Sequence, residues 1–423
     1  MTTIAAGPPA RLRGEPLRNE HLTFRANTDA GRHGWLRLTP AYGVGLVRER
    51  VARLEAGAVV TDPFSGSGTT PLAAAEAGHL GQSLDVNPFL IWLGTAKTRA
   101  YPAGVAAETV RLAAEVVGSA AGLLTRDDLW RPALHAIERW WSPGVLRGLC
   151  ALRAALDDAA PEGAHRDLLL LALCRTLISR SEAAFNHQSM SFSAPKSASP
   201  RAFDPAEATG TLEAFTVAAA ELAAQAAVTL PGRAVVVQAD SRSPEAAALE
   251  PCDLLLTSPP YVNRMSYIRE LRPYMYWLGH LEVAADAGEL DWRAIGGTWG
   301  AATSKLNGWE PSGCTPVDGA MEPVCRAVAE AGGKHGPLLA TYVHKYFHDM
   351  WRHLSAVPAL VRPGGHVSYV VGNSSFYGQL VPAQEWYAAM LRAAGFDEVA
   401  VHVLRKRNSN KALFEYEVTG VRP

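Results

Sequence analysis

Cysteine is scarce in this chain, and its cysteines do not form a metal or disulfide framework. The 423 residues include five, with no C-x-x-C pair among them: Cys150, Cys174, Cys252, Cys314 and Cys325. An odd, scattered set is typical of a reducing compartment and argues against structural zinc. The sequence also has no apolar run of membrane-spanning length and no signal-peptide core near its first residue. We therefore expect a soluble, cytoplasmic protein with no metal site and no contact with a membrane.

Neither sign of charge is in excess. The 40 Lys and Arg residues balance 41 Asp and Glu residues, for a formal net charge of −1. Because affinity for phosphates depends on local basic patches, this balance neither predicts nor excludes a nucleic-acid partner. A hydrophobic content of 48% is enough for one large core and at least one further lobe. Basic residues cluster near both ends of the chain, at Arg11, Arg13, Arg18, Arg25, Arg32 and Arg37 and at Arg405, Lys406 and Arg407.

The most informative motif follows a short apolar segment. Residues 253–257, DLLLT, predict a buried strand, and Ser258-Pro259-Pro260-Tyr261 comes directly after it. The two prolines fix φ and remove two backbone donors, so the strand must end in a rigid turn. Ser258 Oγ and the Pro259 carbonyl can then accept both N–H bonds of a planar amino group while Tyr261 stacks on its ring. An ordinary proline-rich turn is the alternative for this tetrapeptide taken alone.

A second motif, much earlier in the chain, is a glycine-rich turn between a strand and a helix. Residues 59–70 read VVTDPFSGSGTT, and an alanine-rich helix is expected over 71–77. Gly66 and Gly68 permit positive φ and close backbone approach, and Thr69 and Thr70 can cap the helix so that free N–H groups face a ligand. The lysine of a phosphate loop is missing, and Asp62 would repel phosphate. The turn, with Asp62 and Phe64, therefore favours a nucleotide-type cofactor that has a cationic amino acid end.

Two further predicted strands end in acidic residues. The segment 82–89, QSLDVNPF, places Asp85 and Asn87 about 20 residues after the glycines, where doubly wound folds hold ribose hydroxyls with a carboxylate. A strand over 234–240 ends at Asp240, which could accept the amino group of an adenine. Helix capping is the alternative for Asp85 taken alone, whereas its position after the glycine turn favours a cofactor contact.

Together, D-P-F-x-G-S-G-T-T and T-S-P-P-Y resemble the motifs of the S-adenosylmethionine-dependent DNA amino-methyltransferases, the N4-cytosine and N6-adenine type. The resemblance implies an α/β fold, with the Rossmann-like seven-stranded sheet of a class I methyltransferase. It also implies that the glycine loop holds the methionine part of S-adenosyl-L-methionine and that the S-P-P-Y residues are catalytic, on the target amine. Residues 33–42 resemble the segment that closes over the methionine end of the cofactor, which adds Thr39 and Tyr42 to the cofactor contacts. Serine before Pro-Pro-Tyr leans toward cytosine N4 within the family.

The resemblance covers about residues 30–100, 232–275 and 340–420, with the cofactor half first. A long interruption therefore falls between the second and third strands. Alanine-rich helices are expected there, at 103–124, 145–160 and 205–228, with a buried helix around 168–173. The expected organisation is an N-terminal arm (1–30), the cofactor half of the core (31–100), a helical insertion as a candidate substrate-recognition lobe (101–231), the core with S-P-P-Y (232–278), a loop-rich insertion (279–339) and the C-terminal core (340–423).

Candidate substrate contacts lie in two places. Within the insertion, residues 185–193 carry many hydrogen-bonding side chains, and Asn186 and His187 could reach base edges. A structural histidine is the alternative for His187. After the S-P-P-Y turn, the segment 263–277 mixes arginines with aromatics, and Asn263, Arg264 and Tyr267 adjoin the site. An amphipathic core helix is the alternative there.

These expectations combine into one function with two alternatives. We expect direct methyl transfer to the exocyclic amine of a flipped base in duplex DNA, cytosine N4 rather than adenine N6, with a separately encoded restriction nuclease as a candidate partner. The first alternative is the same chemistry on RNA or on an amide side chain of a peptide or protein, since such amides present the same planar NH2. The second is a nucleic-acid-binding protein with a vestigial cofactor fold, against which the intact motifs argue.

Overall fold

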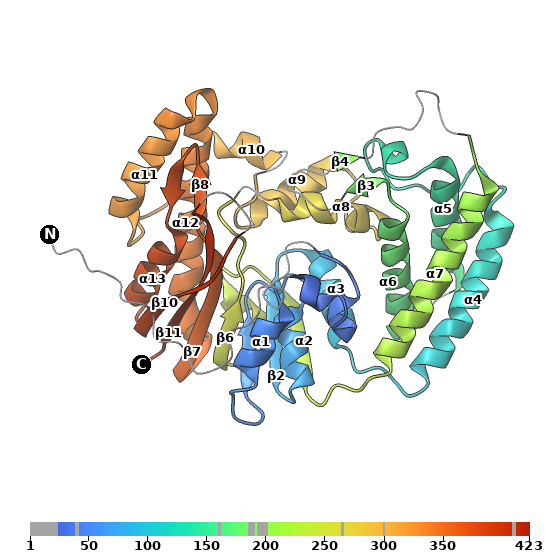
Figure 1. Cartoon of the computed structure of the whole chain (residues 1–423), viewed down its shortest axis with the longest axis horizontal. Coiled ribbons are helices and arrows are strands. Elements are labelled where there is room, and N and C mark those ends of the chain that lie inside the picture. Colours follow the sequence, from blue (N-terminus) through green and yellow to red (C-terminus); the bar gives the residue numbers. More distant parts are fainter. Residues whose placement is uncertain are drawn as a thin grey trace.

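The computed structural model describes residues 24–38, 42–159, 162–184, 191–192, 202–263, 266–298, 301–407 and 412–423. The chain forms two parts that lie side by side: a sheet flanked by helices and a lobe of long helices (Figure 1). Helices α8 and α9 lie between the two parts in this view. Two short 3-10 helices, Phe24–Asn27 and Gly31–Gly34, precede the first strand.

The sheet has seven strands in the order β10-β11-β7-β6-β1-β2-β5. Strands β5, β2, β1, β6 and β7 run parallel to one another, whereas β11 pairs antiparallel with both β7 and β10. This is the predicted α/β, Rossmann-like class I methyltransferase sheet, including its antiparallel edge. The direction of strand addition reverses between β1 and β6, the switch point at which open α/β sheets bind ligands. The strands are β1 (Val59–Asp62), β2 (Leu80–Asp85), β5 (Arg233–Gln238), β6 (Cys252–Thr257), β7 (Val361–Gly372), β10 (Asp397–Lys406) and β11 (Phe414–Val421).

Helices cover both faces of the sheet, because side chains of successive strand residues face opposite sides. On one face, Val60 of β1 with Leu254 and Leu256 of β6 packs against α1 and α2. On the other face, Leu255 of β6 belongs to a core formed with α12 and α13. The helices of this part are α1 (Val44–Val51), α2 (Thr69–Glu76), α3 (Pro88–Thr98), α8 (Tyr267–Trp277), α12 (Gly336–Ala356) and α13 (Ala383–Ala393).

The lobe interrupts the sheet between β2 and β5, its second and third strands in chain order. Its helices are α4 (Val105–Leu123), α5 (Pro143–Ala159), α6 (Ala164–Ser179) and α7 (Pro205–Ala226), which agree with the predicted helical stretches. One continuous hydrophobic core joins them to α3 and α8. A two-stranded hairpin, β3 (Ala183–Ala184) and β4 (Ser191–Phe192), follows α6.

A buried arginine ties the lobe to the sheet. Arg32 Nη1 donates to the carbonyls of Lys97 and Arg99, at 3.1 and 2.8 Å, where α3 ends. Its Nη2 donates to the carbonyls of Ala226 and Val228, at 2.9 and 2.6 Å, where α7 ends. Because helix ends leave carbonyls without intrahelical partners, one guanidinium satisfies groups of both parts.

The segment 279–339 is largely helical, which corrects the expected loop-rich insertion. It contains α9 (Ala284–Arg293), α10 (Ala301–Leu306) and α11 (Asp318–Ala331). Outside this segment, a hairpin of β8 (Ser374–Phe376) and β9 (Gln379–Val381) follows β7. Met321, Cys325 and Val328 of α11 recur at helical spacing and are buried in the core shared with α12. This packing outweighs the low helix propensity of a segment that contains Pro323.

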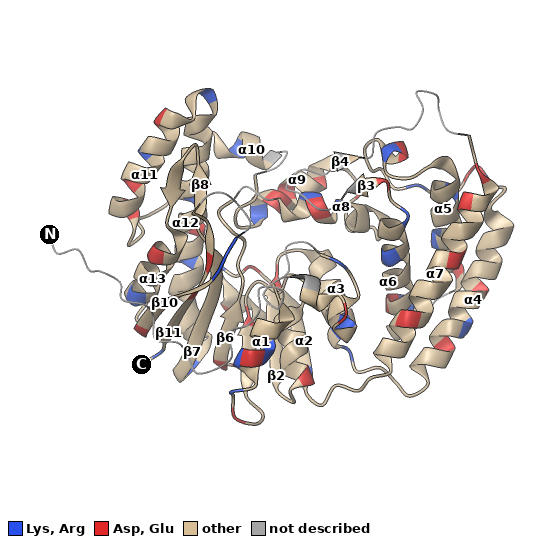
Figure 2. Ribbon diagram, in the orientation of Figure 1, with Lys and Arg blue, Asp and Glu red and all other residues tan. Residues whose placement is uncertain are grey.

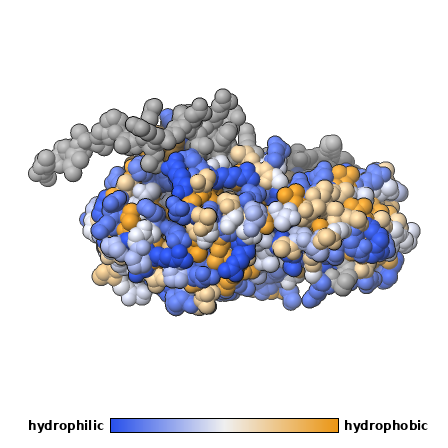
Figure 3. Space-filling model, turned by 90° about the horizontal axis from the view of Figure 1, so that it is seen from below, coloured by the Kyte–Doolittle hydropathy of each residue, from blue (hydrophilic) through white to orange (hydrophobic). Residues whose placement is uncertain are grey.

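The surface is mixed in charge and polarity. Lys and Arg are interspersed with Asp and Glu over both parts (Figure 2). Figure 3 shows hydrophilic and hydrophobic residues interspersed over one face of the molecule. Among the large hydrophobic residues, Val110, Val217 and Val228 are exposed. Within the described ranges, no helix has both the length and the apolar character that crossing a membrane requires.

Candidate active site

The two sequence motifs meet at the switch point of the sheet. Strands β1 and β6 are parallel neighbours, with Val60 beside Leu254, so their carboxyl ends lie together. There the Thr257 hydroxyl donates to Asp62 Oδ1 at 2.6 Å. This hydrogen bond joins the residue before S-P-P-Y to the acid that precedes the glycine loop.

Asp62 is fully buried, and its two carboxylate oxygens have different surroundings. Oδ1 accepts from the Thr257 hydroxyl and from the Phe64 N–H, the latter at 3.0 Å. Oδ2 is buried and makes no hydrogen bond of normal geometry with the described residues, although the Thr70 side chain lies close enough to favour the charged form of the acid. Burial raises the pKa of Asp62 to about 6, because the charged form loses its hydration. A cation beside Oδ2 would satisfy this oxygen and favour the charged form, so the position fits the ammonium of the cofactor that the sequence implies.

The glycine loop has a backbone that suits glycine alone. Gly66 and Gly68 have φ of 51° and 74°, and Gly68 is the N-cap of α2. A Cβ added to Gly68 would lie 3.2 Å from the Cα of Gly94 in α3. The predicted capping by Thr69 and Thr70 is wrong, because α2 has no side-chain cap. Thr69 Oγ1 lies 2.9 Å from Ser67 Oγ, and Thr70 Oγ1 donates to the Leu256 carbonyl at 3.3 Å. The first turn of α2 contains no acidic residue, which leaves its positive end available to an anion.

Asp85 and Asn87 shape the end of β2. Asp85 accepts from the N–H groups of Gly66 and Asn87, at 3.1 and 2.9 Å, and burial raises its pKa to about 6. Its carboxylate therefore holds the glycine loop, and its remaining lone pairs can accept from a ribose hydroxyl. Asn87 caps α3, since its side chain accepts from the Phe89 N–H at 3.0 Å. A cofactor contact by either residue stays a prediction.

Asp240 follows β5 and is paired with an arginine. Arg242 Nε and Nη2 donate to its two carboxylate oxygens at 2.9 and 2.7 Å, and Arg242 Nη1 donates to Asp349 at 2.8 Å. Burial alone would raise the pKa of Asp240, but the hydrogen bonds and charge of Arg242 lower it. Asp240 is thus a charged group at the carboxyl end of the sheet, and its contact with an adenine stays a prediction.

Two aromatic residues lie near Asp62. Burial, and next the nearby charge of Asp62, raises the pKa of Tyr42. The Tyr42 hydroxyl pairs with Thr70 Oγ1. Phe64 packs edge-on against His353, with ring centres 4.8 Å apart. Both aromatic residues therefore lie near the acid, Phe64 through its backbone N–H, and their contact with the cofactor stays a prediction. Thr39 lies outside the described residues.

The S-P-P-Y turn is held by three other elements. The Ser258 hydroxyl donates to the Val370 carbonyl of β7 at 3.2 Å. The Ser258 hydroxyl also contacts the Tyr261 hydroxyl. Because a hydroxyl has one proton and two lone pairs, Ser258 Oγ still keeps one lone pair for a further donor. The Tyr346 hydroxyl of α12 donates to the Pro260 carbonyl at 2.6 Å and lies 2.8 Å from the Tyr387 hydroxyl of α13. With its proton given to Pro260, Tyr346 accepts from Tyr387.

Tyr261 lies against an arginine and a glycine. The guanidinium carbon of Arg407 is 5.6 Å from the centre of the Tyr261 ring, and Arg407 Nη1 donates to the Asn373 carbonyl at 3.0 Å. A Cβ added to Gly372 would lie 2.9 Å from the Tyr261 ring and 2.8 Å from Arg407 Nη1, so the contact requires glycine. Burial raises the pKa of Tyr261, and that of Tyr267 to about 12, which keeps both phenols neutral.

The predicted substrate contacts are only partly within the described chain. Tyr267 is the first residue of α8, and its hydroxyl contacts the Tyr261 backbone. The Asn263 N–H donates to the Tyr261 carbonyl at 2.8 Å. Both residues therefore adjoin the S-P-P-Y turn. Asn186, His187 and Arg264 lie outside the described residues.

Sequence reasoning missed three buried residues that support the motifs. Tyr346 and Tyr387 fix the S-P-P-Y turn but lie far from it in the sequence, with no local signature. Lys97 is fully buried, and its Nζ donates to the Ser67 carbonyl of the glycine loop at 2.9 Å. It had a signal, since it is the one charged residue in the apolar helix PFLIWLGTAKT. Arg407 was noted only as part of a basic cluster.

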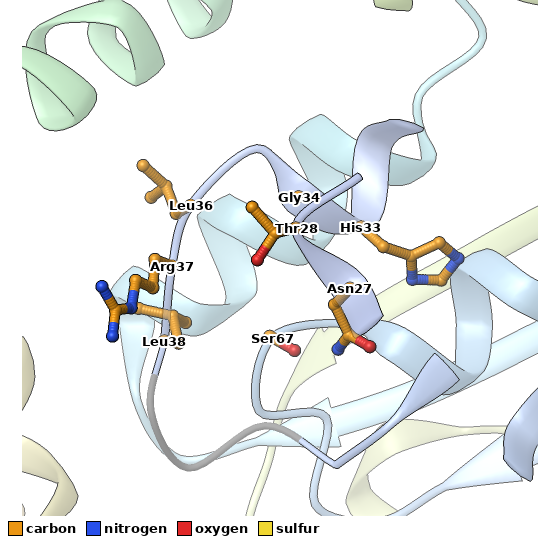
Figure 4. A pocket seen from close by; sticks show the side chains of 8 residues that line it. All are labelled: Asn27, Thr28, His33, Gly34, Leu36, Arg37, Leu38 and Ser67. Carbon is orange, nitrogen blue, oxygen red and sulfur yellow. The ribbon is translucent and has the colours of Figure 1, made fainter. Parts of the chain in front are cut away.

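A small pocket lies between the segment before α1 and the glycine loop (Figure 4). Its volume of about 20 Å³ has room for a group of the size of a water molecule. In the part of the chain that the structure describes, no three His, Cys, Asp or Glu side chains group as a metal site. The pocket is lined by Asn27, Thr28, His33, Gly34, Leu36, Arg37, Leu38 and Ser67.

Comparisons with known proteins give weak likenesses. No protein-family model and no curated protein matches the sequence. The chain is similar to the crystal structure of TrmN from Thermus thermophilus, at 11% identity and a TM-score of 0.31, over 94% of this chain and 53% of TrmN. It thus spans about half the length of TrmN. It is also similar to the rRNA methyltransferase aviRa from Streptomyces viridochromogenes, at 12% identity and a TM-score of 0.28, over 94% of this chain and 96% of aviRa. We therefore assign the fold class from the strand order and the candidate site from the contacts of its residues.

Proposed function

We propose that this protein is an S-adenosylmethionine-dependent methyltransferase that modifies an exocyclic amino group of a DNA base, with cytosine N4 favoured over adenine N6. The observation that carries the proposal is the hydrogen bond from Thr257 to Asp62. It joins a loop suited to a cationic amino acid end and a turn suited to a planar amine at one point of the sheet. Methyl donor and methyl acceptor can therefore meet there.

The cofactor half of the site has a matching group for each end of the donor. S-adenosylmethionine supplies a methyl group on a positively charged sulfur. We assign its ammonium to Asp62 Oδ2, the buried oxygen that makes no hydrogen bond of normal geometry with the described residues. The ribose is assigned to Asp85 and the adenine to Asp240, at the carboxyl ends of the next two strands along the sheet. Tyr42 and Phe64 adjoin the ammonium end.

An amine conjugated to a ring is a weak nucleophile, and the S-P-P-Y turn can increase its reactivity. We assign its two N–H bonds to Ser258 Oγ and the Pro259 carbonyl, since the Pro260 carbonyl already accepts from Tyr346. These two bonds draw the nitrogen toward tetrahedral geometry and direct its lone pair at the methyl group. The new N–C bond forms as the S–C bond breaks, and the surplus proton leaves the nitrogen for solvent. Positioning supplies most of the rate.

The surroundings of Tyr261 favour a nucleic acid over a peptide amide. A base in a duplex must leave the stack, at a cost of roughly a few kcal/mol, and an aromatic ring can receive it. Arg407 places a positive charge beside that ring, where a nucleotide brings a phosphate and an amide side chain brings none. A separately encoded restriction nuclease is the partner we propose for such a modification enzyme.

The direct test is a panel of acceptors. The purified protein is incubated with methyl-labelled S-adenosylmethionine and, separately, duplex DNA of mixed sequence, structured RNA or a peptide mixture rich in Asn and Gln. The proposal predicts label in DNA at a rate well above that in RNA or peptide. Label confined to RNA or peptide would keep the chemistry and replace the substrate, and cofactor binding without transfer to any acceptor would refute the enzyme itself.

A further inference from the structure

Lys97 is a buried cation directly behind the glycine loop. It lies in the last turn of α3 and is 0% exposed. Its Nζ donates to the Ser67 carbonyl at 2.9 Å and to the His33 carbonyl at 3.3 Å. One ammonium thus joins the glycine loop to the segment that the sequence places over the methionine end of the cofactor.

The charge of Lys97 is not balanced by a carboxylate in the described chain. Burial lowers the pKa of Lys97 to about 7, and no acidic group offsets that effect. The nearby Glu76 is already paired, with Arg48 Nη2 at 2.7 Å and with His33 Nε2 at 3.3 Å. A buried charge is costly unless an opposite charge compensates it, so this position calls for an anion.

The carbonyls that Lys97 contacts belong to residues that line the small pocket. In Figure 4 the Ser67 side chain lies among the lining residues, whereas the His33 ring points away from them and its Nε2 pairs with Glu76 of α2. Arg37 also lines the pocket. His33 Nδ1 is buried without a hydrogen-bond partner among the described residues. The positive end of α2, which has no acidic residue in its first turn, begins at the same loop. Cationic and donor groups therefore gather on this side of the loop, while the anionic Asp62 stands at its start.

The cofactor's amino acid end carries one ammonium and one carboxylate. We propose that Lys97 is the positioning residue that selects the carboxylate, by fixing the Ser67 peptide and by supplying the positive charge that Asp62 does not. This inference rests on the proposed function, and it assigns the two charges of the amino acid end to opposite sides of the loop. Lys97 acts through the loop rather than by contact with the reacting atoms.

Binding of two donor analogues tests the assignment without any turnover. S-adenosylmethionine and its decarboxylated form share the ammonium, the sulfonium and the adenosine, and differ in the carboxylate. Their dissociation constants are measured by calorimetry for the wild type and for Lys97→Gln, whose neutral amide can still donate to both carbonyls. We expect the wild type to prefer the carboxylated form by about tenfold or more, and Lys97→Gln to lose that preference with little change for the decarboxylated form.

Two further variants keep the result interpretable. Lys97→Arg retains the charge and should retain the preference. Lys345→Met removes a buried lysine of α12 that has its own carboxylate partner, Asp349 at 2.5 Å, and should leave the ratio of the two affinities unchanged. Equal weakening of both analogues in Lys97→Gln, or an unchanged ratio, would overturn the role of Lys97. A wild type that binds neither analogue would instead refute the proposed function.

Discussion

Asp62 uses its two carboxylate oxygens for different contacts. Oδ1 is held by Thr257 and by the Phe64 backbone, which fixes the acid at the junction of β1 and β6. Oδ2 is buried and makes no hydrogen bond of normal geometry in the described chain, a costly arrangement that persists in folded proteins where a ligand completes it. Asp62 therefore makes structural contacts through Oδ1 and offers Oδ2 as an acceptor to a ligand. A substitution that keeps the first and removes the charge of the second can distinguish these roles.

Replacing Asp62 with Asn should weaken cofactor binding while preserving the fold. The amide oxygen can still accept from Thr257, but the group no longer pairs with an ammonium. Hydrogen bonds to charged groups contribute about 1.5–3 kcal/mol, so the dissociation constant for S-adenosylmethionine should rise roughly ten- to a hundredfold by calorimetry. Asp253→Asn is the control, since Asp253 accepts from the Val59 N–H at the opposite end of the same strands. Wild-type affinity in Asp62→Asn would contradict the assignment.

The pKa of Asp62 also fixes the sign of the pH dependence. Burial raises that pKa to about 6, so the carboxylate is charged above pH 6 and neutral below it. Affinity for the cofactor should fall by up to tenfold per pH unit below 6, and it should also fall above about pH 7, where Lys97, whose pKa burial lowers to about 7, loses its charge. Asp85 titrates in the same range, so the profile of Asp62→Asn reports any remaining contribution. Identical profiles for the two proteins would exclude Asp62 as the titrating group.

Arg407 should act on the acceptor and not on the cofactor. Its guanidinium lies over the Tyr261 ring and is fixed by the Asn373 carbonyl. Arg407→Ala should raise the KM for DNA by about tenfold, reduce its dependence on salt, and leave the dissociation constant of the cofactor unchanged. Lys406→Ala, an exposed neighbour at the end of β10, should change KM much less. Loss of cofactor affinity in Arg407→Ala would show that the residue belongs to the other half of the site.

At the scale of elements, the S-P-P-Y turn depends on helices that the motif does not contain. Tyr346 of α12 donates to the Pro260 carbonyl and accepts from Tyr387 of α13. Both phenols are buried, and burial raises the pKa of each, so they remain neutral donors over the working pH range. The geometry of the turn therefore depends on the packing of α12 and α13.

Tyr346→Phe should impair transfer without affecting cofactor binding. The change leaves the Pro260 carbonyl and the Tyr387 hydroxyl without this partner, which costs about 1–3 kcal/mol of unfolding free energy. We expect a lower kcat with an unchanged cofactor dissociation constant, measured together with denaturant unfolding. Tyr387→Phe keeps the bond to Pro260 and should have a smaller effect on kcat. Unchanged kcat in Tyr346→Phe would mean that the turn is rigid through its prolines alone.

Several elements could be predicted from the sequence and others could not, for physical reasons. The alanine-rich stretches and the apolar strands before Asp62 and Thr257 have strong local signals, and their helices and strands form as expected. The sequence signal for helix α11 is weak, because the segment contains Pro323 and its apolar stripe is short. Packing against α12 stabilises this helix. The prediction of a threonine cap at α2 was also wrong, since Gly68 is the N-cap residue and the helix has no side-chain cap.

On the scale of the whole molecule, the lobe and the sheet are joined by a buried guanidinium. Arg32 donates to carbonyls at the ends of α3 and α7, so its four hydrogen bonds span the two parts. Arg32→Met should lower the free energy of unfolding by at least about 3 kcal/mol, because buried carbonyls lose a charged donor. Denaturant unfolding measures this, with Arg48→Met, from an exposed ion pair, expected to change it by less than about 1 kcal/mol. Equal effects of the two substitutions on the free energy of unfolding would contradict a stabilising role for the Arg32 hydrogen bonds between α3 and α7.

The assembly of the site from distant segments sets the limit of sequence reasoning. The motifs around Asp62 and Ser258 were recognisable because each keeps its chemistry within a few residues. Tyr346 and Arg407 act on those motifs only through the packing of α12 and the end of β10, which no local pattern predicts. Lys97 has a local signal, as the one charged residue of an apolar helix, but that signal does not predict its contact with the glycine loop. The strand order brings β1 beside β6 and so converts two separate predictions into one site.

The most direct measurement is the identity of the methylated product. Duplex DNA is incubated with the protein and methyl-labelled S-adenosylmethionine, digested to nucleosides and analysed by mass spectrometry, in parallel with Tyr261→Ala. We expect labelled N4-methylcytosine from the wild type and none from Tyr261→Ala, which should still bind the cofactor. Absence of any labelled nucleoside from a wild-type protein that binds the cofactor would contradict it.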